Sequence, residues 1–529
     1  MKIINRILTL IGGVLIVSCA QIVPLSGGER DTTPPEEVKS YPQNNSINIK
    51  AQKIEIEFSE FIQLQNIQQE FIASPPFKNK PTITARGKKV IIQLNDSLNK
   101  NTTYCLNFGN AIVDITEQNP KTDYKYVFST GNYIDSLKFK GQVLSAFELE
   151  PQEQVLVMLY KAFDDSLPLK QKPDFVGRTN KEGSFEITNL REGQYKCFAL
   201  KDQNTNYIYD LPNEEIAFLK DPIYISSKSL LDTTLYLFKE DNELQYVKSF
   251  NAKKSFQISI KLNKPADSIS VNSLNNIPSS LIKIHHEKLA DYCMVWYDNP
   301  NQKDSLYFEV LANGKIVDTI SFPAPKGLKD KITITSNVST PHCPEVKISV
   351  KFDYPITSID TSLITLLEDS VPVAIDYIFN EDSTQLILKN KWKEHTFYQL
   401  NFLPKAVTYK NRLFNDSAKV EFKTNSKSYY SSLFLKLNSN KSKDVLIYFG
   451  KQNETIAPVF IYKSVKNIEF VNNEPGNYTL KLAIDENGNE KWDTGNYLQK
   501  KYPEKIIKYN KSIALKQGWD SEIIWELNY

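Results

Sequence analysis

Two acidic segments far apart in this 529-residue chain share one pattern. Asp202 to Asp210 and Asp485 to Asp493 both read D-x-N-x-N-x-x-x-D, with an aromatic residue directly before the last aspartate. Each segment begins seven positions after the tyrosine of a Gly-x-Tyr triplet. A repeat this close indicates a duplicated structural module, so the chain has to fold into at least two copies of one unit. The triplets are Gly193-Gln194-Tyr195 and Gly476-Asn477-Tyr478.

A second set of residues repeats with a different unit. In each copy a phenylalanine is followed by a tyrosine 46 positions later, and a second phenylalanine follows 24 positions after that. The anchors are Phe58, Tyr104 and Phe128 in the first copy and Phe352, Tyr398 and Phe422 in the second. Agreement in both residue type and spacing indicates two copies of one fold. The second copy lacks Ser59-Glu60, so the fold does not need these two residues.

The local pattern is that of β-strands. Apolar and polar residues alternate in stretches such as Lys53 to Phe58, and long runs with helical period are scarce. In Tyr104 to Phe108 the alternation directs Tyr104, Leu106 and Phe108 inward and Cys105 and Asn107 to the opposite face. The 28 Tyr and 28 Phe, against only 3 Met, suit such a chain. We therefore predict an all-β protein built from tandem β-sandwiches.

Four short motifs in the first part of the chain carry a family resemblance. They are Ser40-Tyr41-Pro42, Phe58-Ser59-Glu60, the run from Thr102 to Phe108, and the run from Phe128 to Gly131. Together they resemble the SbsA-type bacterial Ig-like domain, and the leader from Cys19 to Pro35 resembles that of Ig-like-domain lipoproteins of some Gram-negative envelopes. The resemblance implies a β-sandwich of about 100 residues.

The modules that contain the acidic segments are similar to a different family. The turn at Gly183 and the Gly-x-Tyr triplet that follows it resemble transthyretin-like or carboxypeptidase-regulatory-like sandwiches. The resemblance implies an accessory fold without catalytic function.

These patterns predict a chain of seven segments, in which the two kinds of module each occur twice around a middle domain. The segments are a signal peptide (1–18), a lipidated tether (19–35), an Ig-like domain (36–132), a transthyretin-like sandwich (133–240), a sandwich of undefined type (241–342), a second Ig-like domain (343–425) and a second transthyretin-like sandwich (426–529).

The N-terminus reads as a lipoprotein signal. Lys2 and Arg6 precede an apolar run from Ile7 to Val17 that is too short to span a bilayer. The run ends at Ser18 and Cys19, which resembles the bacterial lipobox with Cys19 as the lipidated residue. We therefore expect a lipid anchor on Cys19 as the link to the membrane. Because Ala20, not Asp, follows the cysteine, we expect the outer membrane, on either its periplasmic or its outer face.

Composition and motifs exclude several classes of function. Lys+Arg 64 against Asp+Glu 62 gives no basic excess, which argues against a nucleic-acid partner. No nucleophile, zinc-protease or nucleotide-binding motif is present. His285-His286-Glu287 would need a third ligand to hold a metal, and adjacent strand residues face opposite ways. The chain is therefore not expected to be an enzyme.

The acidic segments are the candidate metal sites. Oxygen-bearing side chains at positions 1, 3, 5 and 9 resemble the start of a calcium loop. Neither copy has glycine at position 6 or glutamate at position 12, and Asx-turns that cap the backbone of a strand connection account for the same residues. Calcium is thus the one cofactor considered, with a metal-free turn as the alternative. The residues are Asp202, Asn204, Asn206 and Asp210 in the first copy and Asp485, Asn487, Asn489 and Asp493 in the second.

Aromatic residues gather around the second acidic segment. Trp492, Tyr497 and Tyr502 are candidates for a partner-binding or sugar-stacking patch, and packing within or between domains is the alternative. The sequence as a whole predicts a non-catalytic lipoprotein that is a structural or protein-interaction subunit of a cell-envelope complex. Its expected partners are an outer-membrane β-barrel assembly, export or transport machine, or other envelope proteins. A surface adhesin or glycan-binding lipoprotein is the alternative.

Overall fold

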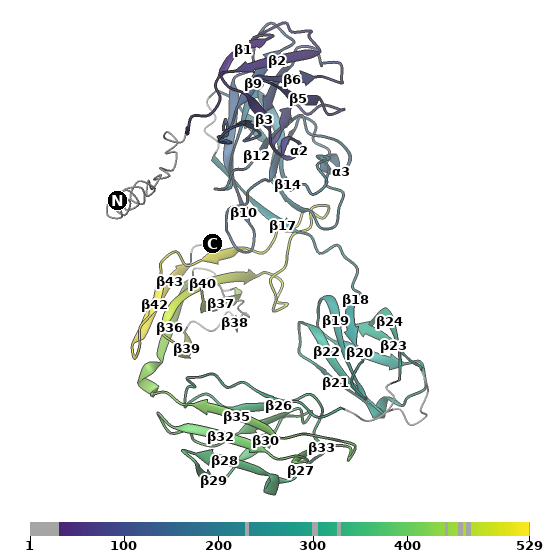
Figure 1. The fold of residues 1–529 in the computed structure, drawn as a ribbon, viewed down its shortest axis with the longest axis vertical. Coiled ribbons are helices and arrows are strands. Elements are labelled where there is room, and N and C mark those ends of the chain that lie inside the picture. Colours follow the sequence, from purple (N-terminus) through teal and green to yellow (C-terminus); the bar gives the residue numbers. More distant parts are fainter. Residues whose placement is uncertain are drawn as a thin grey trace, which may run out of the picture. The chain divides into compact units, whose positions relative to one another are not determined.

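The computed structural model describes residues 31–227, 232–298, 305–324, 330–439, 443–452, 459–461 and 467–527. The signal peptide, Cys19 and most of the tether lie outside the described residues. Strands dominate the described chain, and the few helices are single turns (Figure 1). The all-β prediction is confirmed. Among the described residues, no helix has the length and apolar character needed to cross a membrane.

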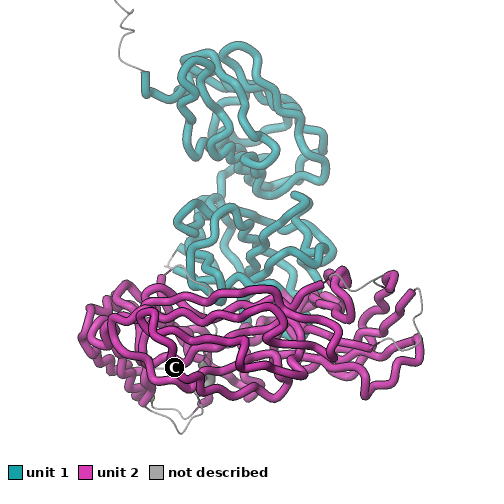
Figure 2. Tube along the Cα trace, turned by 60° about the horizontal axis from the view of Figure 1, so that its bottom comes forward, with its two compact units in different colours: residues 1–239, 497–501 teal, residues 240–496, 502–529 magenta. Residues whose placement is uncertain are grey.

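The chain divides into two compact units, which Figure 2 colours separately. One comprises Met1–Lys239 and Tyr497–Lys501, and the other comprises Glu240–Asn496 and Tyr502–Tyr529. Among the described residues the buried apolar side chains form five clusters, and the residues around each cluster are called a module below. The clusters run from about residue 49 to 128, 137 to 237, 247 to 324, 332 to 422 and 433 to 527, and Trp296 also joins the fourth.

The first module is a sandwich of two main sheets. One sheet has the order β1-β2-β6-β5 and the other β4-β7-β9, while β3 and β8 pair separately. On β2 the buried Ile54 and Ile56 alternate with Glu55 and Glu57, as the sequence pattern predicted. The elements are β1 (Glu37–Tyr41), β2 (Lys53–Phe58), β3 (Ile62–Leu64), α2 (Ile67–Glu70), β4 (Ile72–Ser74), β5 (Thr82–Arg86), β6 (Lys89–Gln93), β7 (Thr103–Asn107), β8 (Ile112–Asp114) and β9 (Lys125–Ser129).

The fourth module repeats this plan and adds one strand to each of two sheets, β29 beside β28 and β34 beside β33. Its sheets run β25-β26-β31-β30 and β29-β28-β32-β35, and β27-β33-β34 is the third. The elements are β25 (Ile334–Ser336), β26 (Ser349–Phe352), β27 (Ser358–Ile359), η2 (Thr361–Leu363), β28 (Ile364–Glu368), β29 (Val371–Val373), β30 (Tyr377–Phe379), β31 (Gln385–Leu388), β32 (Phe397–Phe402), β33 (Val407–Tyr409), β34 (Leu413–Phe414) and β35 (Ala418–Lys423).

The repeated tyrosines have the same environment in both copies. Tyr104 stacks on Phe128 with ring centroids 5.2 Å apart, and Tyr398 stacks on Phe422 at the same distance. The hydroxyl of Tyr104 accepts a hydrogen bond of 2.9 Å from the backbone N–H of Asn99, five residues upstream. Tyr398 accepts an equivalent 2.9 Å bond, also from five residues upstream. The residues whose spacing repeats therefore also pack in the same way in both modules.

The second module joins its two sheets through β15 and β17, in the order β12-β11-β14-β15-β17-β10-β13, and β16 pairs with β14. Strands β10 and β17 are parallel, with Gly141 opposite Thr233. The elements are β10 (Leu137–Ser145), β11 (Leu156–Tyr160), α3 (Leu167–Lys170), β12 (Phe175–Arg178), β13 (Ser184–Leu190), β14 (Gly193–Lys201), β15 (Glu215–Phe218), β16 (Ile223–Ile225) and β17 (Asp232–Lys239).

The fifth module has the same strand arrangement as the second module, but its strands form two separate sheets. These are β38-β37-β40-β41, with β42 paired to β40, and β39-β36-β43. Its parallel pair is β36 with β43. The η3 turn (Lys427–Tyr429) precedes it. The strands are β36 (Ser431–Ser439), β37 (Asp444–Lys451), β38 (Val459–Ile461), β39 (Asn467–Asn473), β40 (Gly476–Asp485), β41 (Ile506–Lys508), β42 (Ile513–Leu515) and β43 (Asp520–Leu527).

The Gly-x-Tyr triplets now have a structural meaning. The Tyr195 hydroxyl donates to the carbonyl of Arg191 at 2.7 Å, and the Tyr478 hydroxyl donates to the carbonyl of Glu474 at 2.7 Å. Both bonds reach four residues back and tie the start of β14 or β40 to the preceding turn.

The middle module is also a sandwich. Its sheets are β18-β19-β22-β21 and β20-β23-β24, with cores of Ile, Leu, Val and Phe between them. The elements are β18 (Val247–Asn251), β19 (Gln257–Ala266), β20 (Ile269–Ser273), η1 (Ser279–Leu281), β21 (Ile282–His286), β22 (Ala290–Tyr297), β23 (Ser305–Ala312) and β24 (Lys315–Pro323).

Candidate functional site

A seam between the first two modules, both in the first unit, is the strongest candidate for a site. Two edge strands meet there, β4 of the Ig-like sandwich and β12 of the next sandwich. The backbone N–H of Val176 donates to the Ser74 side chain at 3.1 Å. The Lys172 ammonium donates to the carbonyls of Phe77 and Lys78 at 2.9 and 3.0 Å. Long side chains of one module therefore bind the main chain of the other.

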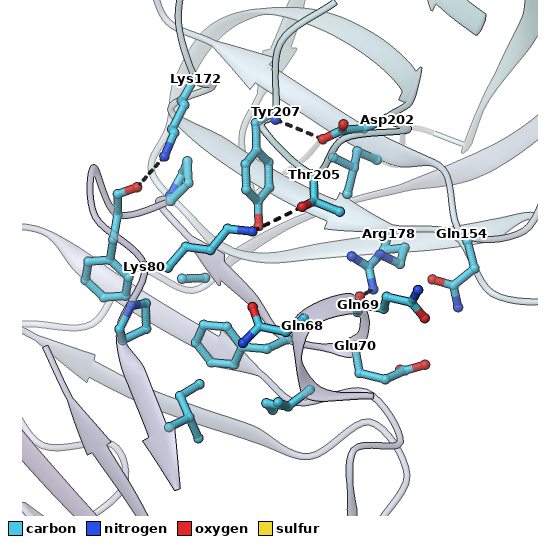
Figure 3. A pocket seen from close by; sticks show the side chains of 18 of the residues that line it. Gln68, Gln69, Glu70, Lys80, Gln154, Lys172, Arg178, Asp202, Thr205 and Tyr207 are labelled. Carbon is cyan, nitrogen blue, oxygen red and sulfur yellow. Dashed lines mark hydrogen bonds between the residues drawn. The ribbon is translucent and has the colours of Figure 1, made fainter. Parts of the chain in front are cut away.

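The seam encloses a pocket of about 460 Å³ (Figure 3). One wall comes from α2, β4 and the segment up to β5, and the other comes from β11, β12 and the first acidic loop. Phe71, Phe77, Ile83 and Leu156 supply an apolar lining. Ligand sites in proteins are often found between domains, in pockets with an apolar lining and a few polar groups, and this pocket has that composition.

Arg178 is the most unusual residue in this pocket. Its guanidinium donates from Nη1 to the carbonyl of Gln69, and its buried Nε has no hydrogen-bond partner among the described residues. Within the described residues it forms no ion pair. Burial lowers the pKa of Arg178, the result of removing a cation from water, yet an arginine stays charged at neutral pH. The side chain is half-buried, and the Glu70 and Asp202 carboxylates attract its charge and oppose the effect of burial.

Two lysines extend the positive charge of the pocket. Lys80 donates to the Thr205 hydroxyl at 3.1 Å, and Lys172 lies over the Tyr207 ring, 5.9 Å from its centroid. Burial lowers the pKa of Lys172 as well. Figure 3 shows Arg178 beside Gln69 and Gln154, and Lys80 beside Tyr207 on the other side of the pocket.

The carboxylates near these cations are engaged elsewhere. Glu70 accepts from the backbone N–H of Asn110 at 3.1 Å. Asp202 accepts from the backbone N–H of Tyr207 at 2.8 Å and from that of Asn204 at 3.2 Å. Three cations and two carboxylates line the pocket, so it carries a net positive charge.

The first acidic loop connects β14 to β15. The structure brings its four predicted side chains together: the amide nitrogens of Asn204 and Asn206 donate to the carboxylate of Asp210 at 3.1 and 2.8 Å. Asp202 caps backbone N–H groups of the loop, as in an Asx-turn. Glu214, which is fully buried, accepts from the backbone N–H groups of Gln203, Asp210 and Leu211.

The second acidic loop connects β40 to β41 and repeats this bonding. Asn487 and Asn489 donate to the Asp493 carboxylate, and Asp485 accepts from the backbone N–H of Glu490 at 2.9 Å. Glu504 takes the place of Glu214 and accepts from the backbone N–H groups of Glu486 and Asp493. Burial raises the pKa of Glu504.

These oxygen-rich loops suit a hard cation in their donor chemistry. In both copies, however, the amide nitrogens of two asparagines donate hydrogen bonds to the last aspartate, which satisfies its carboxylate without a cation. Within the described residues, no group of three or more His, Cys, Asp or Glu side chains has a metal-binding arrangement. Calcium binding would require the asparagine amides to turn their oxygens toward the aspartate.

The three residues of the predicted aromatic patch belong to different units: Tyr497 to the first, and Trp492 and Tyr502 to the second. Tyr497 is buried in the first unit, where its ring contacts Phe198 and Phe218 and its hydroxyl donates to the carbonyl of Asp165. The Trp492 indole donates to the carbonyl of Glu504 at 2.8 Å. Tyr502 is 42% exposed. Of the three residues, Tyr502 presents the most open surface, and Tyr497 serves packing.

The remaining chemical candidates have structural roles. His285 pairs with Asp382, whereas the His286 ring lies by the carbonyls of Ala266 and Tyr292, so the two histidines face different groups. Cys105, Cys197, Cys293 and Cys343 are buried free thiols. Cys105 packs toward the second module, with its sulfur 3.9 Å from the Thr188 hydroxyl.

Sequence reasoning missed the seam pocket. Its key residues are single cations at the ends of short strands or in loops, and their meeting depends on how two modules pack. Arg178, which ends the apolar stretch Phe175 to Gly177, was the one local signal, because an arginine there has to lie at the border of a core.

Comparison with known protein families identifies the first module. Residues 31–130 match the family described as bacterial Ig-like domain, so the chain contains such a domain at its first module. No curated protein matches the chain.

Several solved structures of tandem domains are similar. Domains 1–6 of the surface layer protein SbsC align at 11% identity over 90% of this chain and 67% of that one, with a TM-score of 0.14. Domains 4–9 align at 10% identity over 81% and 64%, with a TM-score of 0.20. The Sidekick-1 immunoglobulin domains 1–5 align at 10% identity over 94% and 100%, with a TM-score of 0.13. At these values the comparisons carry no statement about function.

Proposed function

We propose that this protein is a non-catalytic lipoprotein of the outer membrane, anchored through Cys19, that acts as a structural or protein-interaction subunit of a cell-envelope complex. An outer-membrane β-barrel assembly, export or transport machine is the proposed partner. The observation that carries the proposal is the seam of the first unit. It joins two accessory sandwiches through side chains of one that bind the main chain of the other, and it leaves a positively charged hollow between them.

Three further observations support it. The described residues fold into sandwiches, a bacterial Ig-like domain is present, and the side chains that looked chemically active are engaged in turns and cores. The leader from Lys2 to Cys19 supports the anchor.

Affinity purification of the tagged full chain from detergent-solubilised outer membranes tests the proposal. We expect a β-barrel protein to copurify in amounts comparable to the bait. A Cys19→Ser chain, which lacks the anchor, serves as the control for contact made only by sharing a membrane. Recovery of the bait without any envelope protein would contradict the proposal.

The alternative is a surface adhesin or glycan binder, and the exposed ring of Tyr502 is the observation in its favour. Glycan-array binding that is lost in Trp492→Ala and Tyr502→Ala variants would support it. An array without signal would remove it.

A further inference from the structure

The seam pocket holds three cations that have no carboxylate partner within the described chain. Arg178, Lys80 and Lys172 all line it, and their hydrogen bonds go to neutral oxygens: the Gln69 carbonyl, the Thr205 hydroxyl and two carbonyls of the Ig-like module. A half-buried guanidinium that forms no direct ion pair within the described residues gains from an incoming anion. The pocket is therefore complementary to a negative group.

The planar guanidinium of Arg178 favours a carboxylate, because its parallel N–H groups match two carboxylate oxygens. Its Nη1 already donates to Gln69, and its buried Nε has no partner. Of its five N–H donors, only the Nη1 bond is made within the described residues. The remaining donors allow one more acceptor to dock on the open side of the group.

The rest of the pocket is suited to a peptide. Four glutamines, whose side chains make no hydrogen bond within the described residues, supply both donors and acceptors for peptide groups. Phe71, Ile83 and Leu156 provide an apolar surface for a side chain. A purely aliphatic acid would leave the amides unused. The glutamines are Gln68, Gln69, Gln154 and Gln203.

We propose that this pocket binds a peptide carboxylate, with the carboxylate on Arg178 and Lys80, the adjoining apolar side chain on Phe71 and Ile83, and the peptide groups on the glutamines. The carboxylate comes from a chain end or from an acidic side chain. The inference rests on the proposed function in taking the partner to be a protein, and it assigns the recognition to the seam.

The test uses fluorescence polarisation with the full chain in detergent and three labelled hexapeptides of glycine and serine. One ends in phenylalanine with a free carboxylate, the second is its C-terminal amide, and the third is an amide with glutamate beside the phenylalanine. We expect at least one carboxylate peptide to bind at least about tenfold more tightly than the neutral amide. Preference for the first peptide identifies a chain end, and preference for the third identifies an acidic side chain.

Variants locate the binding. Arg178→Gln and Lys80→Gln should each weaken binding of the preferred peptide about tenfold or more. Lys80 is exposed, so its substitution leaves the fold intact even if Arg178→Gln does not fold. Lys78→Gln is the matched control, because Lys78 is an exposed lysine two residues away that lines a neighbouring hollow instead of this pocket.

The proposal would be overturned by any of three results: equal binding of the acidic and neutral peptides, no binding of any peptide, or equal effects of Lys78→Gln and Lys80→Gln. Copurification of an envelope protein together with failed peptide binding would refute this pocket alone. Specific peptide binding by a chain that recovers no envelope partner would refute the proposed complex and leave the pocket standing.

Discussion

His342 is a buried base with an incomplete set of partners. It is 2% exposed, its Nε2 lies 3.1 Å from the carbonyl of Val346, and its buried Nδ1 has no hydrogen-bond partner in the described part of the chain. The ring meets Phe422 edge-on at 5.5 Å. Burial lowers the pKa of His342 below its usual value, because a proton on Nδ1 would place a charge in an apolar site.

The lowered pKa predicts acid sensitivity. The unfolded chain binds a proton at a higher pH than the folded chain does, so the free energy of unfolding falls as pH drops through the ordinary histidine range near 6.5. Urea unfolding at pH 7.5 and 5.5, followed by the fluorescence of nearby Trp392, measures this loss. His342→Leu should show a smaller loss between the two pH values. An identical loss in both proteins would contradict the prediction.

The acidic loops give a second prediction at the residue scale. Asp210 and Asp493 each accept hydrogen bonds from two asparagine amides. We expect calorimetric titration with calcium to show no binding in the micromolar range, and chelators to leave the melting temperature unchanged. Two-site calcium binding that is abolished in Asp202→Ala, Asp485→Ala double variants would establish the alternative calcium loops.

At the scale of elements, the duplicated Ig-like modules share one connection that the repeat spacing did not reveal. The Thr130 hydroxyl accepts from the backbone N–H of Thr102 at 3.0 Å and donates to the carbonyl of Asn99 at 2.7 Å. In the second copy, the Thr424 hydroxyl accepts from the backbone N–H of Thr396 at 2.9 Å and donates to the carbonyl of Lys393 at 2.6 Å. In each copy, one threonine hydroxyl at the end of the last strand (β9 or β35) thus binds the turn that precedes the paired strand (β7 or β32).

Replacing this hydroxyl by a methyl group should destabilise the module. Thr424→Val keeps the shape but leaves a buried backbone N–H unpaired, which costs about 1–3 kcal/mol. Denaturation monitored at Trp392 measures the loss, and Thr130→Val provides the matched change in the other copy. Thr408→Val is a control on β33, because no residue that the structure describes forms a hydrogen bond with the buried Thr408 hydroxyl. Equal stability of Thr424→Val and the parent chain would contradict the assigned role.

The sequence predicted these elements better than it predicted the contacts between modules. Alternation and spacing were enough for the strands and their duplication, because Tyr104 and Tyr398 face cores built from their own modules. The seam was not predictable in this way. Arg178 and Lys172 bind carbonyl groups of another module, and a carbonyl is present at every residue and leaves no trace in the sequence.

At the scale of the whole molecule, the proposed anchor makes a direct prediction. Cys19→Ser removes the thiol that lipidation needs, so we expect the variant to leave the membrane fraction and to lose incorporation of labelled palmitate. Cell fractionation and metabolic labelling measure both. Cys343→Ser, a change at a buried thiol far along the chain, serves as the control. Continued membrane attachment of the Cys19 variant would refute the anchor.

The parallel pairing of β10 with β17 has a consequence for how the protein is made. Gln142 on β10 and Thr234 on β17 are neighbours although 92 positions separate them. During synthesis, β10 therefore has one unpaired edge until β17 is available. Unpaired strand edges can pair with other chains and so promote aggregation. During the proposed export of the chain, we expect β10 to depend on chaperones or on rapid delivery of the later strands. Slowing translocation between residues 145 and 232 should raise aggregation and proteolysis more than the same delay placed after β17.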